Sequence, residues 1–222
     1  AAVLYNWLPA TEGKRDVDAK LTTQLSLPSW SQIRAFFDLG ENGRSACASL
    51  FSQGFIMFSA MHLFINYGSW LKNDYQFTPS QLGQIALILG IADLSASVIV
   101  SMFTDRFGKR RSVLWGTSIG TIGFAVLPFM NSGVETAVIG LLIVRFAFEF
   151  SVVSNLAVMS EQVPTQRGKM MTLSAATALL GSTLAGFTGP LAYAKIGLWG
   201  LGIIPAITLG ITVVMILYFV KE

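Results

Sequence analysis

Apolar runs long enough to cross a bilayer recur along this chain, and they constrain its fold more than any other feature. A helix needs about 20 apolar residues to span the roughly 30 Å hydrocarbon core of a membrane. The predicted spans are residues 47–70, 81–103, 112–130, 136–159, 170–192 and 198–220. Backbone groups in lipid are satisfied only in helices or closed barrels, and these runs lack the period-two alternation of barrel strands. We therefore expect an all-α integral membrane protein with six transmembrane helices.

The composition fits a membrane protein and excludes several kinds of site. Hydrophobic residues make up 53% of the chain and charged residues only 12%, against about a quarter charged in soluble domains. The single cysteine, Cys47, excludes an intrachain disulfide and a cysteine-based metal cage. The single histidine, His62, has no Gly-x-Ser-x-Gly elbow to serve, and the sequence contains no nucleotide-binding loop. We therefore expect no enzyme, no cofactor and no metal site.

Lysine and arginine residues concentrate in alternate loops, which indicates how the chain is oriented. The basic segments contain Lys14, Arg15, Lys20, Arg34 and Arg44 before the first span, Arg106, Lys109, Arg110 and Arg111 after the second, and Arg167 and Lys169 after the fourth. The intervening loops hold only Lys72 and Lys195. By the positive-inside rule, the linker before the first span and the C-terminus are cytoplasmic, and the protein is integral to the cell membrane. Because topology accounts for the net charge of +3, we expect a lipid bilayer around the chain and no nucleic-acid partner.

The first 46 residues divide into two segments. Residues 1–10 have the composition of the last turns of a preceding transmembrane helix, so we expect the sequence to be an excerpt of a longer protein. Residues 11–46 are polar and are expected to form a cytoplasmic linker. If its second part is helical, Trp30, Ile33 and Phe36 lie near one face, as in an amphipathic helix at the membrane surface. A loosely ordered tether fits equally well, and residues 47–222 then form the six-helix domain.

The loop between the second and third spans carries the most specific motif. It reads SMFTDRFGKRRSVL, and it resembles the signature loop of the major facilitator superfamily, approximately G-x-L-x-D-R-x-G-R-R. Ser101 replaces the usual first glycine, and the matching residues are Asp105, Arg106, Gly108, Lys109 and Arg110. The resemblance implies that this loop is a latch of a cytoplasmic gate, with Asp105 facing the helix that begins after Arg167. These charges could instead serve only to set the topology.

A second loop supports the same resemblance. The segment SEQVPTQRGKMM, between the fourth and fifth spans, is similar to the P-x-x-x-R-G loop of that family through Glu161, Pro164, Arg167 and Gly168. The resemblance covers essentially the whole chain. It implies two inverted three-helix repeats that together form the C-terminal half of a twelve-helix transporter, with an N-terminal six-helix half as partner.

The fifth span contains a glycine-rich segment, GSTLAGFTGPLA, with Gly181, Gly186, Gly189 and Pro190. It is similar to the Gly-Pro motif of antiporters in the superfamily, but its spacing is imperfect and the motif there belongs to the other half. Small residues also let membrane helices approach closely. We expect the segment to serve helix packing.

Ionisable residues inside the spans are candidates for a substrate and proton pathway, because charge within a bilayer is costly. Arg145 and Glu149 are four residues apart, so they share a helix face and could pair directly. Such a pair is either a self-neutralised structural feature or one that substrate or a proton breaks by competition. Asp93 has no basic partner within a turn of its own helix. It is either a protonatable acid or a carboxyl group hydrogen-bonded to Ser95 and Ser97.

Further polar residues extend the predicted pathway. His62 and Asn66 lie four residues apart in the first span, which we expect to border water. His62 could relay protons or could be a hydrogen-bonded packing residue. Asn155 adds a polar group to the fourth span, and in the resembled fold the first and fourth helices of each half line the central cavity.

The function expected from these features is secondary active transport of a small solute by alternating access, with proton-coupled efflux as the leading hypothesis. The alternatives are a symporter or uniporter for sugars or organic acids, and a non-transporting membrane receptor with the same fold. Loss of transport on neutralising Asp93 or Glu149 would separate a carrier from a receptor. Substrate identity, direction, coupling ion and oligomeric state do not follow from the sequence.

Overall fold

The computed structural model describes residues 39–40 and 42–220, so the predictions for residues 1–10 and for most of the linker lie outside the described part. Within it the chain folds into helices joined by short connections. In chain order these are α4 (Gly43–Phe64), α5 (Tyr67–Tyr75), α6 (Pro79–Phe107), α7 (Lys109–Val126), η1 (Leu127–Met130), α8 (Val134–Gln162), η2 (Pro164–Gln166), α9 (Arg167–Ile196) and α10 (Leu198–Phe219). The first helix begins four residues before the predicted boundary, so the end of the predicted linker is helical.

Six helical segments of the described part are long and apolar enough to cross a membrane, which confirms the predicted number of spans. They are Gly43–Tyr75, Pro79–Met102, Lys109–Met130, Val134–Gln162, Pro164–Ile196 and Leu198–Phe219. Some helices extend beyond the apolar runs because polar residues cap them. At the start of α6, for example, the backbone N–H of Thr78 donates to Gln81 Oε1 at 2.9 Å, and the backbone N–H of Gln81 donates to Thr78 Oγ1 at 3.4 Å. This capping box starts the helix at Pro79, two residues before the predicted span.

The first span is broken in two, whereas the sequence predicted one continuous helix. The backbone N–H of Asn66 donates to the carbonyl of Leu63 at 2.9 Å, three residues back. The carbonyl of His62, its normal helical acceptor, instead accepts from the Asn66 side chain at 2.9 Å. An asparagine that competes for a backbone acceptor in this way interrupts the helical ladder. The interruption at Ile65–Asn66 therefore separates α4 from α5.

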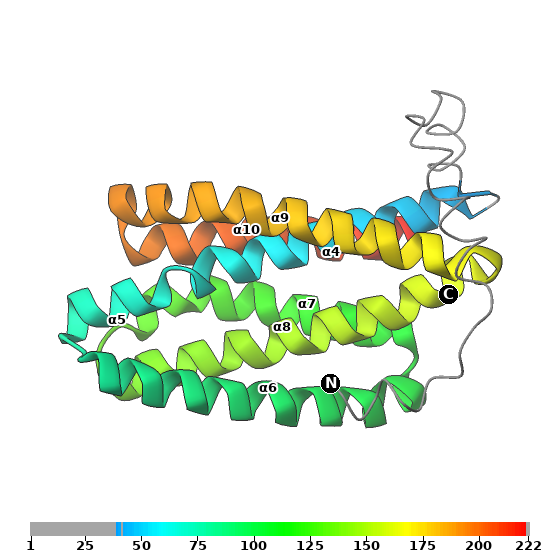
Figure 1. Cartoon of the computed structure of the whole chain (residues 1–222). Coiled ribbons are helices and arrows are strands. Elements are labelled where there is room, and N and C mark those ends of the chain that lie inside the picture. Colours follow the sequence, from blue (N-terminus) through cyan, green and yellow to red (C-terminus); the bar gives the residue numbers. More distant parts are fainter. Residues whose placement is uncertain (1–38, 41, 221–222) are drawn as a thin grey trace, which may run out of the picture. The chain divides into compact units, whose positions relative to one another are not determined.

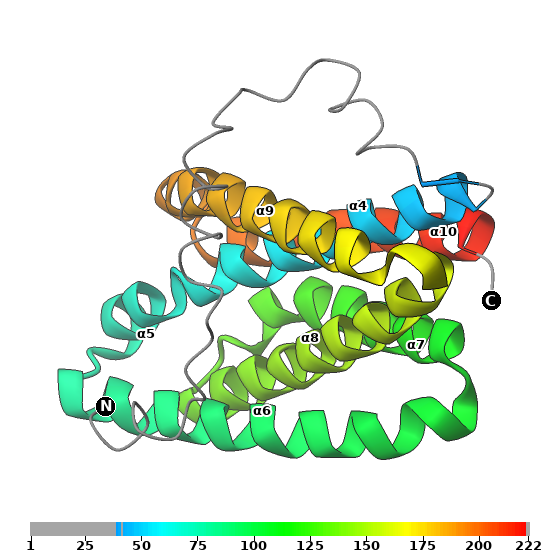
Figure 2. The same ribbon diagram turned by 45° about the vertical axis from the view of Figure 1, so that its right-hand side comes forward.

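The six spans form two interlocked repeats of three helices, which confirms the predicted fold class. Helix α4 packs against α9 and α10, the second and third helices of the second repeat, and α8 packs against α6 and α7, their counterparts in the first. Figures 1 and 2 show α4 beside α9 and α10, and α8 between α6 and α7, with α4 and α8 running in opposite directions. This exchange of equivalent contacts is the pattern of an inverted repeat.

Glycines let α4 and α9 approach closely, as the packing interpretation of GSTLAGFTGPLA predicted. A Cβ atom added at Gly181 would lie 2.1 Å from the carbonyl oxygen of Gly54, and one added at Gly189 would lie 2.7 Å from Asn66 Nδ2. Neither space can hold a methyl group. Gly186 differs, because its added Cβ would meet only Ile65 Cδ1 at 3.9 Å.

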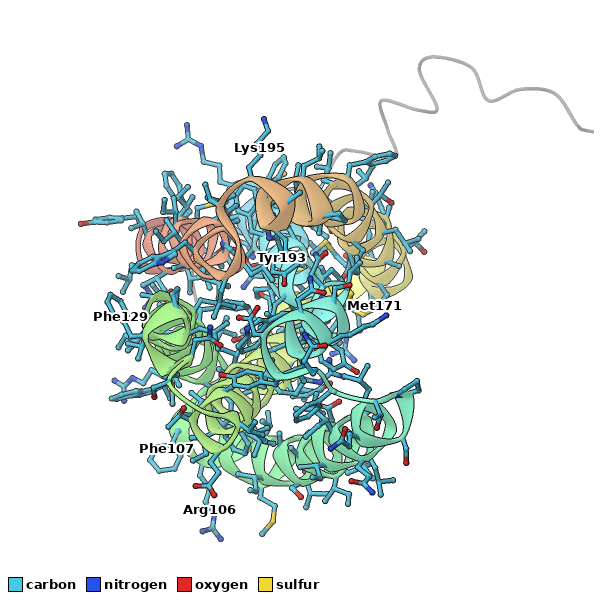
Figure 3. All side chains as sticks on the ribbon, turned by 90° about the vertical axis from the view of Figure 1, so that its left-hand side faces the viewer. Arg106, Phe107, Phe129, Met171, Tyr193 and Lys195 are labelled. Carbon is cyan, nitrogen blue, oxygen red and sulfur yellow. The ribbon has the colours of Figure 1, made fainter. Side chains whose placement is uncertain are left out.

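Burial separates an inner helix from outer ones. The apolar window of the span that begins with α4 is 56% buried, whereas that of α6 is only 22% buried. The exposed face of α6 carries Leu87, Ile91, Leu94 and Val98 at helical spacing, as expected where a helix faces lipid or another membrane domain. Figure 3 looks along the bundle and shows Arg106 and Lys195 pointing away from it. The centre of the bundle is thus reached by few charged side chains.

Candidate substrate and proton site

The predicted pathway residues Asp93 and Arg145 meet between α6 and α8. Arg145 Nε donates to Asp93 Oδ1 at 2.6 Å and to Oδ2 at 2.8 Å, and its Nη2 donates to Oδ2 at 2.5 Å. Both side chains are mostly buried, with 24% of Arg145 and 18% of Asp93 exposed. The predicted direct pair between Arg145 and Glu149 is therefore wrong for the described structure. A carboxylate on the facing helix presents both oxygens to the planar guanidinium, a geometry that favours strong charge-assisted bonds.

An aromatic pair covers the guanidinium. The Cζ atom of Arg145 lies 4.0 Å from the centroid of the Phe64 ring, within the range of a cation–π contact. The ring of Phe64 in turn meets Phe148 edge to face, with centroids 5.3 Å apart. Helix α4 thus supplies one wall of the site, and α8 supplies both a charge and an aromatic ring. The sequence analysis did not single out Phe64, because only tertiary packing brings α4 to Arg145.

Glu149 is the carboxylate that the ion pair leaves out. Its Oε2 accepts from Ser97 Oγ at 3.4 Å, a long contact with a neutral donor. Ser95 instead donates to the carbonyl of Ile91 at 2.8 Å, and Asp93 is paired with Arg145, so the predicted bonds from Ser95 and Ser97 to Asp93 are not formed. With both acids ionised, Asp93, Arg145 and Glu149 carry a net charge of −1. We refer to these residues with Phe64, Ser97 and Phe148 as the charged cluster.

Asn155 lies apart from the charged cluster and joins two helices. Its Nδ2 donates to Gln53 Oε1 at 2.9 Å and to the carbonyl of Ser49 at 3.2 Å, and all three residues are buried. These bonds connect α8 to α4 nearer the cytoplasmic ends of both helices. In the described structure Asn155 thus contributes to helix packing.

His62 and Asn66 are also buried, on the side of α4 that faces α9. Asn66 is held by its bond to the His62 carbonyl, and Gly189 of α9 leaves room for it. Neither ring nitrogen of His62 has a hydrogen-bond partner in the described part of the chain, so the predicted hydrogen-bonded histidine is not observed. Its ring lies 5.3 Å from that of Phe58. The structure does not bring this pair into contact with the charged cluster.

Comparison with known proteins decides the family. The family model of the Major Facilitator Superfamily matches residues 49–222, most of the chain. The chain belongs to the major facilitator superfamily. Two proteins of Bacillus subtilis (strain 168), both described as uncharacterized MFS-type transporters, are similar to it. YceJ is 30% identical over 125 residues, which are 54% of this chain and 32% of YceJ, and YwfA is 28% identical over 148 residues, 64% of this chain and 35% of YwfA.

Membership of the major facilitator superfamily places this chain among integral membrane transporters rather than enzymes. The matched segments cover about a third of the length of the two curated relatives. This length corresponds to part of such a transporter, in keeping with the six spans of the described part. The superfamily does not specify a substrate, so the chemistry of the charged cluster has to suggest one.

The gate motif of this superfamily member holds helix ends together at the cytoplasmic side. Lys109 at the start of α7 pairs with Glu161 near the end of α8. Arg110 Nη2 donates to the carbonyl of Leu217 at 2.7 Å, so it caps the end of α10. Gly108, at φ +86°, makes the turn between α6 and α7 that a residue with a Cβ rarely adopts.

Two other gate residues are exposed, and one lies beyond the description. Arg106 ends α6, and Arg167 is the first residue of α9, as predicted from the P-x-x-x-R-G loop. The side chain of Asp105 lies outside the described part of the structure. Its predicted contact with the helix that begins at Arg167 therefore stays a prediction.

Proposed function

We propose that this chain is the C-terminal six-helix half of a twelve-helix transporter that exports a small solute in exchange for protons. Its partner would be an N-terminal six-helix half, and its linker and C-terminus would lie in the cytoplasm of a cell whose plasma membrane it spans. The observation that carries the proposal is Glu149, an acid in the middle of a span whose one hydrogen bond in the described structure is a long one to Ser97. Charged groups at this depth are costly unless they serve a function.

The unequal surroundings of the two acids divide their roles. Asp93 receives three bonds from Arg145, so its charge is compensated in place. Glu149 has no comparable counter-ion, and a bound proton would neutralise it. We therefore assign Glu149 as the coupling acid and Asp93 with Arg145 as the pair that positions it. His62, Asn66 and Asn155 support the helix packing around this site in the proposal.

The cytoplasmic contacts fit a half that moves as a unit. Lys109 with Glu161 and Arg110 with the end of α10 connect three helices of the same six-helix domain. A rigid half of this kind can rock against its partner around a site near the midplane, as alternating access requires. The charged cluster, on α4, α6 and α8, would then face that partner.

The test is transport by the full-length protein in sealed inside-out vesicles, with and without an imposed proton gradient, over a broad panel of solutes. Proton-coupled export predicts that at least one solute accumulates only when the gradient is present, and that adding the solute dissipates the gradient. A solute that crosses at the same rate without a gradient would make the protein a uniporter. Failure of every solute to cross, with correct insertion shown by protease protection, would favour the receptor.

A further inference from the structure

We infer that the substrate exchanged for the proton is a monovalent organic cation that carries an aromatic ring, and that its charged group replaces the proton at Glu149. This inference rests on the proposed function and names the substrate class of the same site. Two features carry it: the charge balance of the cluster and the aromatic rings that border it.

The charge balance favours a cation over an anion. Helix α8 packs against α4, α6, α7 and α9. The described ionisable residues of these five helices that lie away from their ends are His62, Asp93, Arg145 and Glu149, whereas the basic residues of α7 and α9 lie in the first or last turn. Because His62 is buried elsewhere, the cluster holds two acids and one base. An added cation or proton would make the cluster neutral, whereas an added anion would double its net charge.

The single base is already engaged. Arg145 donates through Nε and Nη2 to Asp93, and the Phe64 ring covers the face of its guanidinium. An anionic substrate would have to displace Asp93 from a bidentate pair, whereas a cation meets the oxygens of Glu149 with one long hydrogen bond in their way. The easier reaction at this site is therefore the binding of a cation.

The aromatic rings select the rest of the substrate. Phe64 and Phe148 meet edge to face, and Phe146 and Phe150 form a second pair with centroids 6.4 Å apart. All four rings are partly exposed, so they can contact a bound molecule. Phe148 and Phe150 flank Glu149 in the sequence, within one turn of α8. A cation held at Glu149 can thus place an attached ring, or its own charge, against an aromatic face.

One site for two competing cations sets the exchange ratio. A proton bound at Glu149 and a monovalent cation bound at Glu149 both give a neutral cluster, so each substrate ion that binds releases one proton. Competition of this kind couples two ligands without a separate pathway between them. A divalent cation would leave an uncompensated charge in the membrane, which is costly.

The test measures proton release on binding to the full-length protein, solubilised in detergent in a weakly buffered solution with a pH indicator. The probe is trimethylphenylammonium, which has a fixed charge and a ring. Tetramethylammonium lacks the ring, benzenesulfonate has the opposite charge, and benzamide is neutral. We expect trimethylphenylammonium to release about one proton per molecule bound and to bind about tenfold more tightly than tetramethylammonium. Benzenesulfonate and benzamide should release none.

Variants separate this inference from the proposed function. Glu149→Gln should abolish proton release, Phe148→Leu should remove the preference for the ring while proton release remains, and Glu135→Gln, an exposed acid in the first turn of α8, should behave as wild type. If millimolar trimethylphenylammonium does not bind, or binds without releasing protons, the cationic substrate is refuted. If a neutral or anionic solute then drives proton movement that needs Glu149, the proposed function survives alone. If solute-driven proton movement persists in Glu149→Gln, the proposed function fails as well.

Discussion

Arg145 donates to both carboxylate oxygens of Asp93, which is 52 residues away in the sequence and lies on the neighbouring helix. The two residues sit at similar depth. Asp93 lies 14 residues after the start of α6 at Pro79, and Arg145 lies 11 residues after the start of α8 at Val134. Since both helices start on the same side of the membrane and rise 1.5 Å per residue, the pair forms nearly level across the interface.

Breaking this pair on one side should destabilise the protein more than removing it. Asp93→Asn leaves the Arg145 charge without its counter-ion inside the membrane, and we expect a loss of about 3 kcal/mol in the free energy of unfolding. The double variant Asp93→Asn with Arg145→Gln should recover part of that loss. Thermal unfolding of the single and double variants in detergent gives the coupling between the two side chains. Equal, additive losses would mean that the pair does not interact.

Glycine packing between α4 and α9 makes a sharp comparison possible on one helix. Gly181→Ala would place a methyl group 2.1 Å from a backbone oxygen of Gly54, so the two helices must separate. We expect a loss of about 3 kcal/mol or more. Gly186→Ala, whose new Cβ has only a contact at 3.9 Å, should be neutral or slightly stabilising because alanine favours helices. Similar melting temperatures of the two variants would contradict the close contact of α4 and α9.

Asn131 should be important for the outer end of the first span. Its Oδ1 accepts from Trp70 Nε1 at 3.1 Å and from Tyr75 Oη at 2.8 Å, and its Nδ2 donates to Asp74 Oδ2 at 2.8 Å. Asn131→Ala removes all three bonds, and we expect it to cost about 2 kcal/mol. Amide hydrogen exchange in α5 should speed up while exchange in α4 changes little.

A suitable control for that experiment is Ser132→Ala, which loses one exposed contact with Thr136. It should leave exchange in α5 unchanged. Faster exchange throughout both α4 and α5 in Asn131→Ala would show that the break at Ile65–Asn66 does not separate two independent segments.

The cytoplasmic ion pair should contribute little stability. Lys109 and Glu161 are 29% and 53% exposed, so salt and water screen their attraction. Glu161→Gln should cost about 0.5 kcal/mol, and the cost should disappear at high salt. Arg110→Met should cost more and be less sensitive to salt, because Arg110 caps carbonyls of α10 rather than pairing with a charge. Denaturation of each variant at low and high ionic strength tests this difference.

The sequence predicts the spans well because apolar length is a property of each segment alone. Family resemblance to the loop around Asp105 and Arg106 adds the inverted repeats, which no single segment specifies. The break at Asn66 was missed because it depends on a side chain that competes with the backbone of its own helix. The i, i+4 spacing of Arg145 and Glu149 suggested the wrong partner, since a carboxylate on another helix offered better geometry. Comparing the depths of Asp93 and Arg145 along their spans would have found the right one.

Local competition also explains the misassigned serines. Ser95 donates to the carbonyl four residues before it, an acceptor that is always within reach in a helix. Ser97 reaches Glu149 only because α6 packs against α8. Phe64 belongs to the site for the same reason. Residues whose partners lie on other helices need the packing to be known first.

The most direct test of the account is the movement of protons driven by a transported solute in vesicles that contain the full-length protein, compared between Glu149→Gln and Glu135→Gln. Both substitutions remove one carboxylate from α8, but only Glu149 lies in the charged cluster. We predict that Glu135→Gln moves protons at the wild-type rate and that Glu149→Gln, inserted at the same level, moves none. Wild-type proton movement by Glu149→Gln would contradict the assignment of Glu149 as the coupling acid.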